Sequence, residues 1–338
     1  MNLTFEQIRS VTCGTVTVTE EQNGIHFYRF TPEQMELYRE RDARFFDRCH
    51  ASAGVRLRFR TDSENLFLHL LLQPQAGSRK YFAVEIFKNG KCLDMIENFA
   101  DADLPEDYTE VPLPTGDFSK KLRLGKGEKE ITIFLPWNMH TTLKALSLDE
   151  GATLIPLKSP KKLLAFGDSI TQGYDALCPS CRYISKLSDT LNAEEFNKAI
   201  GGEFFWPELA KTKESFIPDY ITVAYGTNDW SKRTYKEFLE NCEGFYKNLS
   251  ENYPDSKIFA ITPIWREDHE KQTDFPSFDS VADHIKTVTA DIPNVTVIEG
   301  FDFVPHKVRY YADLRLHPND DGFKKYAKNL WKLIKKKI

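Results

Sequence analysis

The chain has 338 residues, which is enough for about two domains of ordinary size. Hydrophobic residues make up 41% and charged residues 28%, as in a globular protein with a buried core. A formal net charge of −5 and the lack of an extended basic segment exclude nucleic acid as the expected partner. No run of about 18 apolar residues occurs, so the sequence predicts no membrane span and no membrane partner.

Residues 1–7 lack the charged and apolar regions of a signal peptide. We therefore expect a cytoplasmic protein, or a secreted one if a leader has been removed. Cys178-Pro-Ser-Cys181 is a single C-x-x-C without a second pair, which is weak support for a zinc site. Histidine, aspartate and glutamate show no metal-ligand spacing, so we expect neither a metal nor a cofactor.

The first half of the chain shows the pattern of an all-β domain. Residues 55–60 alternate apolar and basic side chains, the two-residue period of a half-buried strand. Asn89-Gly90 is a strong signal for a tight hairpin. Many short strands with little helix predict a β-sandwich over residues 1–155. The expected strands lie at 55–60, 66–72, 82–87, 130–135 and 143–148.

Strand and helix patterns alternate in the second half, as a parallel sheet requires. Gly151, Pro156 and Pro160 interrupt regular structure between the halves, so we expect the second domain to span residues 160–338. Helical patterns are expected at 235–253, 278–290 and 323–337. The expected strands lie near 162–167, 195–198, 219–225, 257–262 and 295–299.

The first of these strands leads directly into Gly167-Asp168-Ser169. Ser169 therefore stands at the carboxyl end of a buried strand, the edge where ligands of open α/β sheets bind. A Gly-Asp-Ser triplet alone is common, and its serine would then only cap the following helix. The inference depends on partners at other strand ends.

Three such partners follow in order. Gly201-Gly202 comes after the second strand, Asn228 follows the third, and His317 precedes the closing helix. Paired glycines let the backbone approach a ligand and expose an amide N–H. A serine, a glycine, an asparagine and a histidine supply a nucleophile, two oxyanion donors and a general base.

With these residues the chain resembles the SGNH (GDSL-type) hydrolase family from Pro160 to the C-terminus. The resemblance implies Ser169 as the nucleophile and His317 as the base. It implies Gly202 and Asn228 as the residues of the oxyanion hole. It also implies a flavodoxin-like order of the parallel strands.

The acid of the triad departs from the family pattern. It usually stands three positions before the histidine, but that position here is Leu314, and Asp313 stands four before. We expect Asp313 to reach the imidazole through a bulge in the loop, because an ionised partner stabilises an imidazolium better than a neutral dipole. The alternative is a backbone carbonyl that orients the ring.

The layout of the first half resembles the jelly-roll module that precedes the hydrolase domain in some carbohydrate esterases. The expected fold class is therefore α/β, with a flavodoxin-like hydrolase domain preceded by an all-β jelly-roll domain.

Trp265-Arg266 follow the fourth strand at the same sheet edge. We expect Trp265 to stack on a sugar and Arg266 to hold an acid or hydroxyl, although Trp265 would equally serve to pack a loop. No long apolar lid is present, which disfavours a lipase. We therefore expect a serine esterase that removes a small acyl group, most simply acetyl, from a small-molecule or oligosaccharide ester.

Two other functions remain open at this point. One is an acyltransferase, which would pass the acyl group to an alcohol instead of water. The other is an inactive carbohydrate-binding protein, which only the displaced Asp313 supports.

Overall fold

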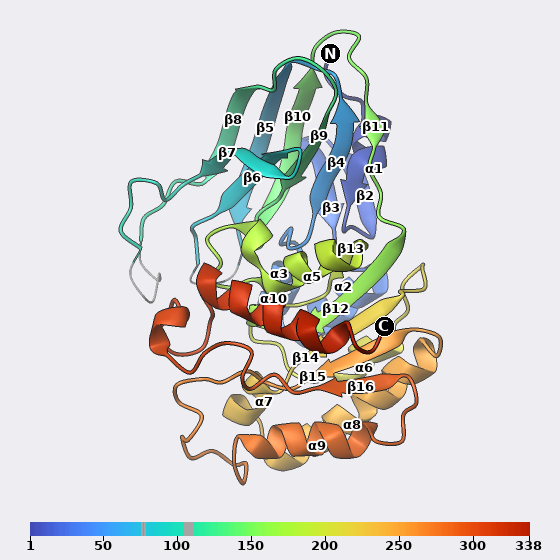
Figure 1. Cartoon of the computed structure of the whole chain (residues 1–338), viewed down its shortest axis with the longest axis vertical. Coiled ribbons are helices and arrows are strands. Elements are labelled where there is room, and N and C mark those ends of the chain that lie inside the picture. The colour runs from blue at the N-terminus through green and yellow to red at the C-terminus, as the bar shows by residue number, and fades with distance from the viewer. Residues whose placement is uncertain (76, 78, 105–110) are drawn as a thin grey trace.

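The computed structural model describes residues 1–75, 77, 79–104 and 111–338. Figure 1 shows two antiparallel sheets at one end of the molecule and a parallel sheet with its helices at the other. This arrangement confirms the expected fold class. None of the helices described has the length and apolar character needed to span a bilayer.

The antiparallel sheets pack face to face around a core of alternate side chains. Leu66, Leu68 and Leu70 are buried against Leu57 and Phe59 of the opposite sheet. One sheet contains, in spatial order, β1 (Thr12–Cys13), β4 (Arg56–Thr61), β9 (Lys129–Phe134), β6 (Ala83–Lys88) and β7 (Lys91–Glu97), and β11 (Ile155–Pro156) pairs with β4. The other contains β2 (Thr17–Glu21), β3 (Gly24–Tyr28), β10 (Met139–Leu148), β5 (Asn65–Pro74) and β8 (Gly116–Arg123).

The predicted hairpin is confirmed between β6 and β7. Asn89 and Gly90 have φ values of 49° and 76°, so both lie in the left-handed region that such a two-residue turn requires.

The expectation of little helix in the first half is incomplete, because α1 (Phe5–Val11), α2 (Pro32–Arg41) and α3 (Ala43–Cys49) lie there. Helix α2 is highly polar and buries few apolar side chains, so it lacks the periodic signal of an amphipathic helix. The sequence feature that indicates the start of α2 is a capping box, in which the side chains of Thr31 and Gln34 each accept the other's backbone N–H.

The parallel sheet has the order β13-β12-β14-β15-β16. Counted within the sheet this is 2-1-3-4-5, the flavodoxin-like order, so that expectation is confirmed. The strands are β13 (Ala193–Asn197), β12 (Lys161–Gly167), β14 (Tyr220–Ala224), β15 (Lys257–Ile261) and β16 (Val295–Ile298).

Helices cover both faces of this sheet, because alternate residues of each strand point to opposite sides. Leu163 and Ala165 of β12 face α5 (Tyr183–Leu191) and α10 (Asp320–Ile334). Leu164 and Phe166 face the cluster built from α6 (Pro207–Lys211), α8 (Tyr235–Asn252) and α9 (Asp279–Thr289). In Figure 1, α10 lies between the sandwich and the end of the molecule that carries α8 and α9.

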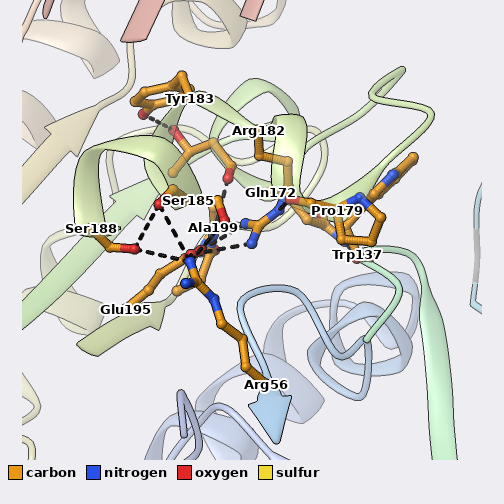
Figure 2. A network of polar contacts seen from close by, with 12 residues as sticks. Arg56, Trp137, Gln172, Pro179, Arg182, Tyr183, Ser185, Ser188, Glu195 and Ala199 are labelled. Atoms are coloured by element: carbon orange, nitrogen blue, oxygen red, sulfur yellow. Dashed lines mark hydrogen bonds and ion pairs between the residues drawn. The ribbon is translucent and has the colours of Figure 1, made fainter. Parts of the chain in front are cut away.

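A buried ionic network joins the sandwich to the parallel sheet. Figure 2 shows Arg56 of β4 extending to the carboxylate of Glu195 on β13, at 3.2 Å. Arg182 contacts the same carboxylate through two nitrogens at 2.7 and 3.2 Å. The side chain of Glu195 is fully buried. The attraction of the two arginines outweighs the effect of burial and lowers the pKa of this carboxyl group.

We predict that Glu195→Gln lowers the free energy of unfolding by about 3–5 kcal/mol, because two buried guanidinium groups lose their shared counter-charge. Urea denaturation measures this, with Glu251→Gln on the exposed surface of α8 as the control. A loss under about 1 kcal/mol would contradict the role given to this network.

Candidate active site

A cavity of about 430 Å³ lies where the strands of the parallel sheet end. Ser169, Gly202, Asn228 and His317 all line it, so the structure brings together four of the residues predicted from separate blocks of sequence. Their convergence follows from the parallel arrangement, because the carboxyl ends of parallel strands meet at one edge of a sheet.

Ser169 begins the short helix α4 (Ser169–Gln172) directly after β12. The carboxylate of Asp168 accepts the N–H of Ile170 at 2.9 Å and so caps this helix. The Ser169 side chain is thereby turned towards the loop before α10. Its Oγ lies 2.8 Å from Nε2 of His317.

His317 is bound on its other side by Asp313. Its Nδ1 lies 2.8 Å from Oδ2 of Asp313. Oδ1 of the same carboxylate accepts the backbone N–H groups of Arg315, Leu316 and His317 at 3.1, 2.8 and 3.0 Å. These donors and His317 outweigh the effect of burial and hold the pKa of Asp313 well below its usual range. Asp313 is therefore ionised at neutral pH.

The extra residue between acid and base is accommodated by Leu314. Its φ of +54° places it in the left-handed region, which is unusual for a residue with a branched side chain. This turn folds the loop back so that Asp313, four positions before His317, faces the imidazole. The bulge expected from the sequence is present in this form.

A second carboxylate lies nearby and was not identified from the sequence. Asp175 is fully buried, and its Oδ2 is 3.5 Å from Nδ1 of His317. Arg79, from the loop after β5, contacts both oxygens of Asp175 at 2.7 and 2.9 Å, and Tyr81 donates at 3.1 Å. The partners of Asp175 lie about 95 positions away in the chain, so no local pattern could have indicated them.

Ser169 and Gly202 line the cavity, and within the described part of the chain neither donates its backbone N–H to an acceptor. The N–H of Gly201, by contrast, is engaged by the side chain of Gln172 at 2.7 Å. Gly202 has a φ of +88°, a conformation that favours glycine. The two glycines therefore differ in role. The N–H of Gly201 holds the turn through Gln172, and the N–H of Gly202 remains available.

Asn228 lies in the first turn of α7 (Thr227–Lys232), after β14. Its Nδ2 donates to the carbonyl of Glu203 at 2.9 Å and approaches Oδ2 of Asp168 at 3.4 Å. The first bond fixes the side chain, and the second is long enough to be exchanged for a stronger acceptor. Burial raises the pKa of Asp168 to about 6.

The two residues predicted to bind substrate are placed differently. Arg266 lines the cavity, but its guanidinium contacts Asp268 at 2.5 and 2.9 Å and Thr227 at 3.1 Å. Trp265 is not among the residues that line the cavity. Its ring packs against His306 at 5.4 Å and Tyr311 at 5.2 Å between centroids. The structure thus places Trp265 in loop packing, the alternative considered for it above.

Other residues of the cavity were missed at the level of sequence. Trp230 and Lys232 follow Asn228 by two and four positions, and Leu316 precedes His317. Arg48 of α3 and Arg79 come from the first half of the chain. No motif marks them, because they reach the cavity only when the sandwich packs against the parallel sheet.

A flavodoxin-like sheet with serine, glycine, asparagine and histidine at its strand ends defines the α/β class of SGNH hydrolases. Residues 165–325 match the model of the GDSL-like Lipase/Acylhydrolase family. This part of the chain is a GDSL-like lipase/acylhydrolase domain. Comparison with curated protein sequences gives no match.

Several solved structures share the whole architecture. The salicylyl-acyltransferase SsfX3 from a tetracycline biosynthetic pathway has a TM-score of 0.78 at 19% identity, covering 96% of this chain and 94% of its own. A putative GDSL-like lipase from Bacteroides ovatus has a TM-score of 0.74 at 20% identity, with coverages of 99% and 97%. An acetyl xylan esterase, Est2A, from the rumen bacterium Butyrivibrio proteoclasticus has a TM-score of 0.64 at 15% identity, with coverages of 100% and 98%. At these identities the likeness establishes the fold, including the β-rich N-terminal part.

We predict that Asp313→Asn lowers kcat on the order of 10,000-fold, as expected when a triad histidine is held in the wrong tautomer. The amide oxygen of the asparagine would keep the contacts of Oδ1, but its NH2 group would donate to Nδ1 of His317. The histidine proton would then move to Nε2, the nitrogen that faces Ser169 and has to accept its proton. Turnover of p-nitrophenyl acetate measures the loss.

Asp321→Asn, an exposed change on α10, is the matched control. A loss within about tenfold would show that a neutral partner orients the ring as well as the carboxylate does.

Proposed function

We propose that this protein is a serine esterase that removes a small acyl group, acetyl in the simplest case, from a carbohydrate or similar short-chain ester. The observation that carries the proposal is the continuous hydrogen-bonded chain from Ser169 through His317 to Asp313, with 2.8 Å at each step. An imidazole so placed removes the proton of a serine hydroxyl near neutral pH.

In the proposed reaction, Oγ of Ser169 attacks the ester carbonyl while Nε2 of His317 takes its proton. Asp313 stabilises the imidazolium that forms. The tetrahedral intermediate then expels the alcohol, which receives the proton from His317, and leaves an acyl-Ser169. Water, deprotonated by the same histidine, attacks this ester and releases the acid and free Ser169.

Negative charge in both tetrahedral intermediates falls on the former carbonyl oxygen. The unengaged N–H groups of Ser169 and Gly202 support an oxyanion hole at this position. Asn228 is the proposed third donor, exchanging its long contact with Asp168 for the oxyanion. The two backbone donors are fixed by the fold before substrate binds, so they need no reorganisation as the charge develops.

The lining of the cavity supports a short acyl group and a polar alcohol. Among the described residues that line it, the apolar side chains are Tyr174, Trp230 and Leu316, and the other side chains are polar or charged. A long acyl chain would lack a dry channel in such a cavity. The carbohydrate alcohol is supported by the acetyl xylan esterase that shares the fold.

We predict that Ser169→Ala abolishes esterase activity and labelling by a fluorophosphonate. The test compares wild type and variant on p-nitrophenyl acetate and acetylated sugars, with mass spectrometry to locate the label. Undiminished turnover in the variant, or a label on another residue, would refute Ser169 as the nucleophile. Analysing products with a competing acceptor alcohol separates hydrolysis from acyl transfer.

Asn228→Ala should lower kcat by about 100- to 1,000-fold with little change in KM, because the donor acts on charge that exists only in the transition state. Full Michaelis profiles provide both constants, and the thermal midpoint checks that the loss of the bond to Glu203 leaves the fold intact. A rise in KM with kcat preserved would place Asn228 in ground-state binding instead.

A further inference from the structure

We propose that the ester recognised at this site carries a negative charge, as a carboxylate or a phosphate close to the acyl linkage. This inference rests on the proposed function and names the class of its substrate.

The first observation is the excess of positive charge around the cavity. Six of the side chains that line it are cationic, and the carboxylate of Asp268 is the one acidic group among the lining residues that the structure describes. The chain as a whole has a net charge of −5, so this concentration is opposite to the overall balance. The six are Arg48, Arg79, Lys232, Arg266, Lys271 and Arg315.

Part of this charge is neutralised within the protein. Asp268 contacts Arg266 at 2.5 Å and Arg315 at 3.5 Å. Asp175 lies beneath the cavity and is bound by Arg79. Asp313 and Asp168 do not line the cavity but contact residues that do. Asp313 is bound to His317, and Asp168 caps α4. Among the residues that the structure describes, the six cationic side chains still outnumber these four carboxylates.

Lys232 and Lys271 contribute to this excess. Among the described residues, the side-chain ammonium group of neither lysine has an ion-pair partner within 4.0 Å or a hydrogen-bond acceptor. An ammonium group beside a cavity with no carboxylate of its own is available to a bound anion.

Lys232 is also directed towards the reacting centre. A Cβ placed on Gly202 would lie 3.7 Å from Nζ of Lys232 and 3.5 Å from Nη1 of Arg48. Partial desolvation lowers the pKa of Lys232. The positive charges of Arg48, Arg266 and Arg315 lower it further, whereas the negative charge of Asp168 raises it. An anion bound between Lys232 and Arg48 would relieve this repulsion, and it would lie within a few ångströms of the N–H of Gly202.

A competing explanation is that the cations stabilise the oxyanion of any ester. The two explanations differ in which substrates they favour. Stabilisation of the oxyanion raises kcat for neutral and anionic esters alike. Recognition of a charged substrate raises kcat/KM for anionic esters alone and weakens as salt screens the attraction.

The test uses the full-length protein and three aryl acetates of similar size. They are 4-acetoxybenzoate, 4-acetoxyphenyl phosphate and the neutral 4-acetoxybenzamide, with each rate divided by that of spontaneous hydrolysis. We expect kcat/KM for at least one anionic ester to exceed that of the amide by about tenfold or more at low salt. This advantage should shrink as NaCl rises to about 0.5 M. The carboxylate and the phosphate arms identify which group the site prefers.

Lys232→Met should reduce the anionic-to-neutral ratio by about tenfold, and Lys232→Arg should retain most of it. Lys247→Met, on the exposed surface of α8, is the matched control and should leave the ratio unchanged. A wild-type ratio near one overturns the proposal. An equal loss on all three esters in Lys232→Met also overturns it, in favour of general oxyanion stabilisation.

A calorimetric arm keeps the inference separate from the proposed function. Binding of glucuronate, glucose 6-phosphate and glucose is measured with wild type and Lys232→Met. If no ester is hydrolysed and Ser169 is not labelled, the proposed esterase fails. The binding data then test charge recognition by themselves. Binding of either anion about tenfold tighter than binding of glucose supports it, and equal binding of all three overturns it.

Discussion

The carboxylate of Glu195, buried between Arg56 and Arg182, is the interaction that sets the two halves of this molecule in register. A buried charge is tolerated only where its partners are fixed, so the network specifies one docking of the sandwich against the parallel sheet. Adjacent contacts extend this specification to the site. Arg29, itself buried, donates to the carbonyls of Asn197 and Ala199, and Arg48 donates to that of Gly201.

These contacts mean that the sandwich holds the loop that carries the proposed oxyanion donor. Residues 197–201 connect β13 to Gly202, and three of their carbonyls are bound by arginines from the first half of the chain. The N–H of Gly202 is therefore oriented by the packing of the two halves together. The sandwich also supplies Arg48 and Arg79 to the cavity wall, so it contributes to the site itself.

The same packing explains why a cationic cavity is stable in an acidic protein. Arg79 is held by the buried Asp175, and Arg266 by Asp268, so these guanidinium groups are positioned by carboxylates of the protein. Among the described residues that line the cavity, the cationic side chains outnumber the carboxylates, so a net positive charge remains there. The lysines at the rim complete a field that favours anions entering from solvent.

The sequence by itself determined the fold class and located several of the residues that the structure brings together at the cavity. The strands of the parallel sheet and five strands of the first half follow from local periodicity, and the hairpin follows from Asn89-Gly90. Strands β2, β3 and β8 were not predicted. Ser169, Asn228 and His317 could be identified because each stands next to a strand or helix end whose position the sequence predicts. The tertiary structure decided the rest. In the tertiary structure the loop bends at Leu314 so that Asp313 contacts His317. Trp265 packs against a loop there and does not line the cavity. The tertiary structure also brought Arg48, Arg79 and Asp175 to the site. These residues are far from the other site residues in sequence and meet them only when the two halves pack together. No local sequence pattern therefore marks them.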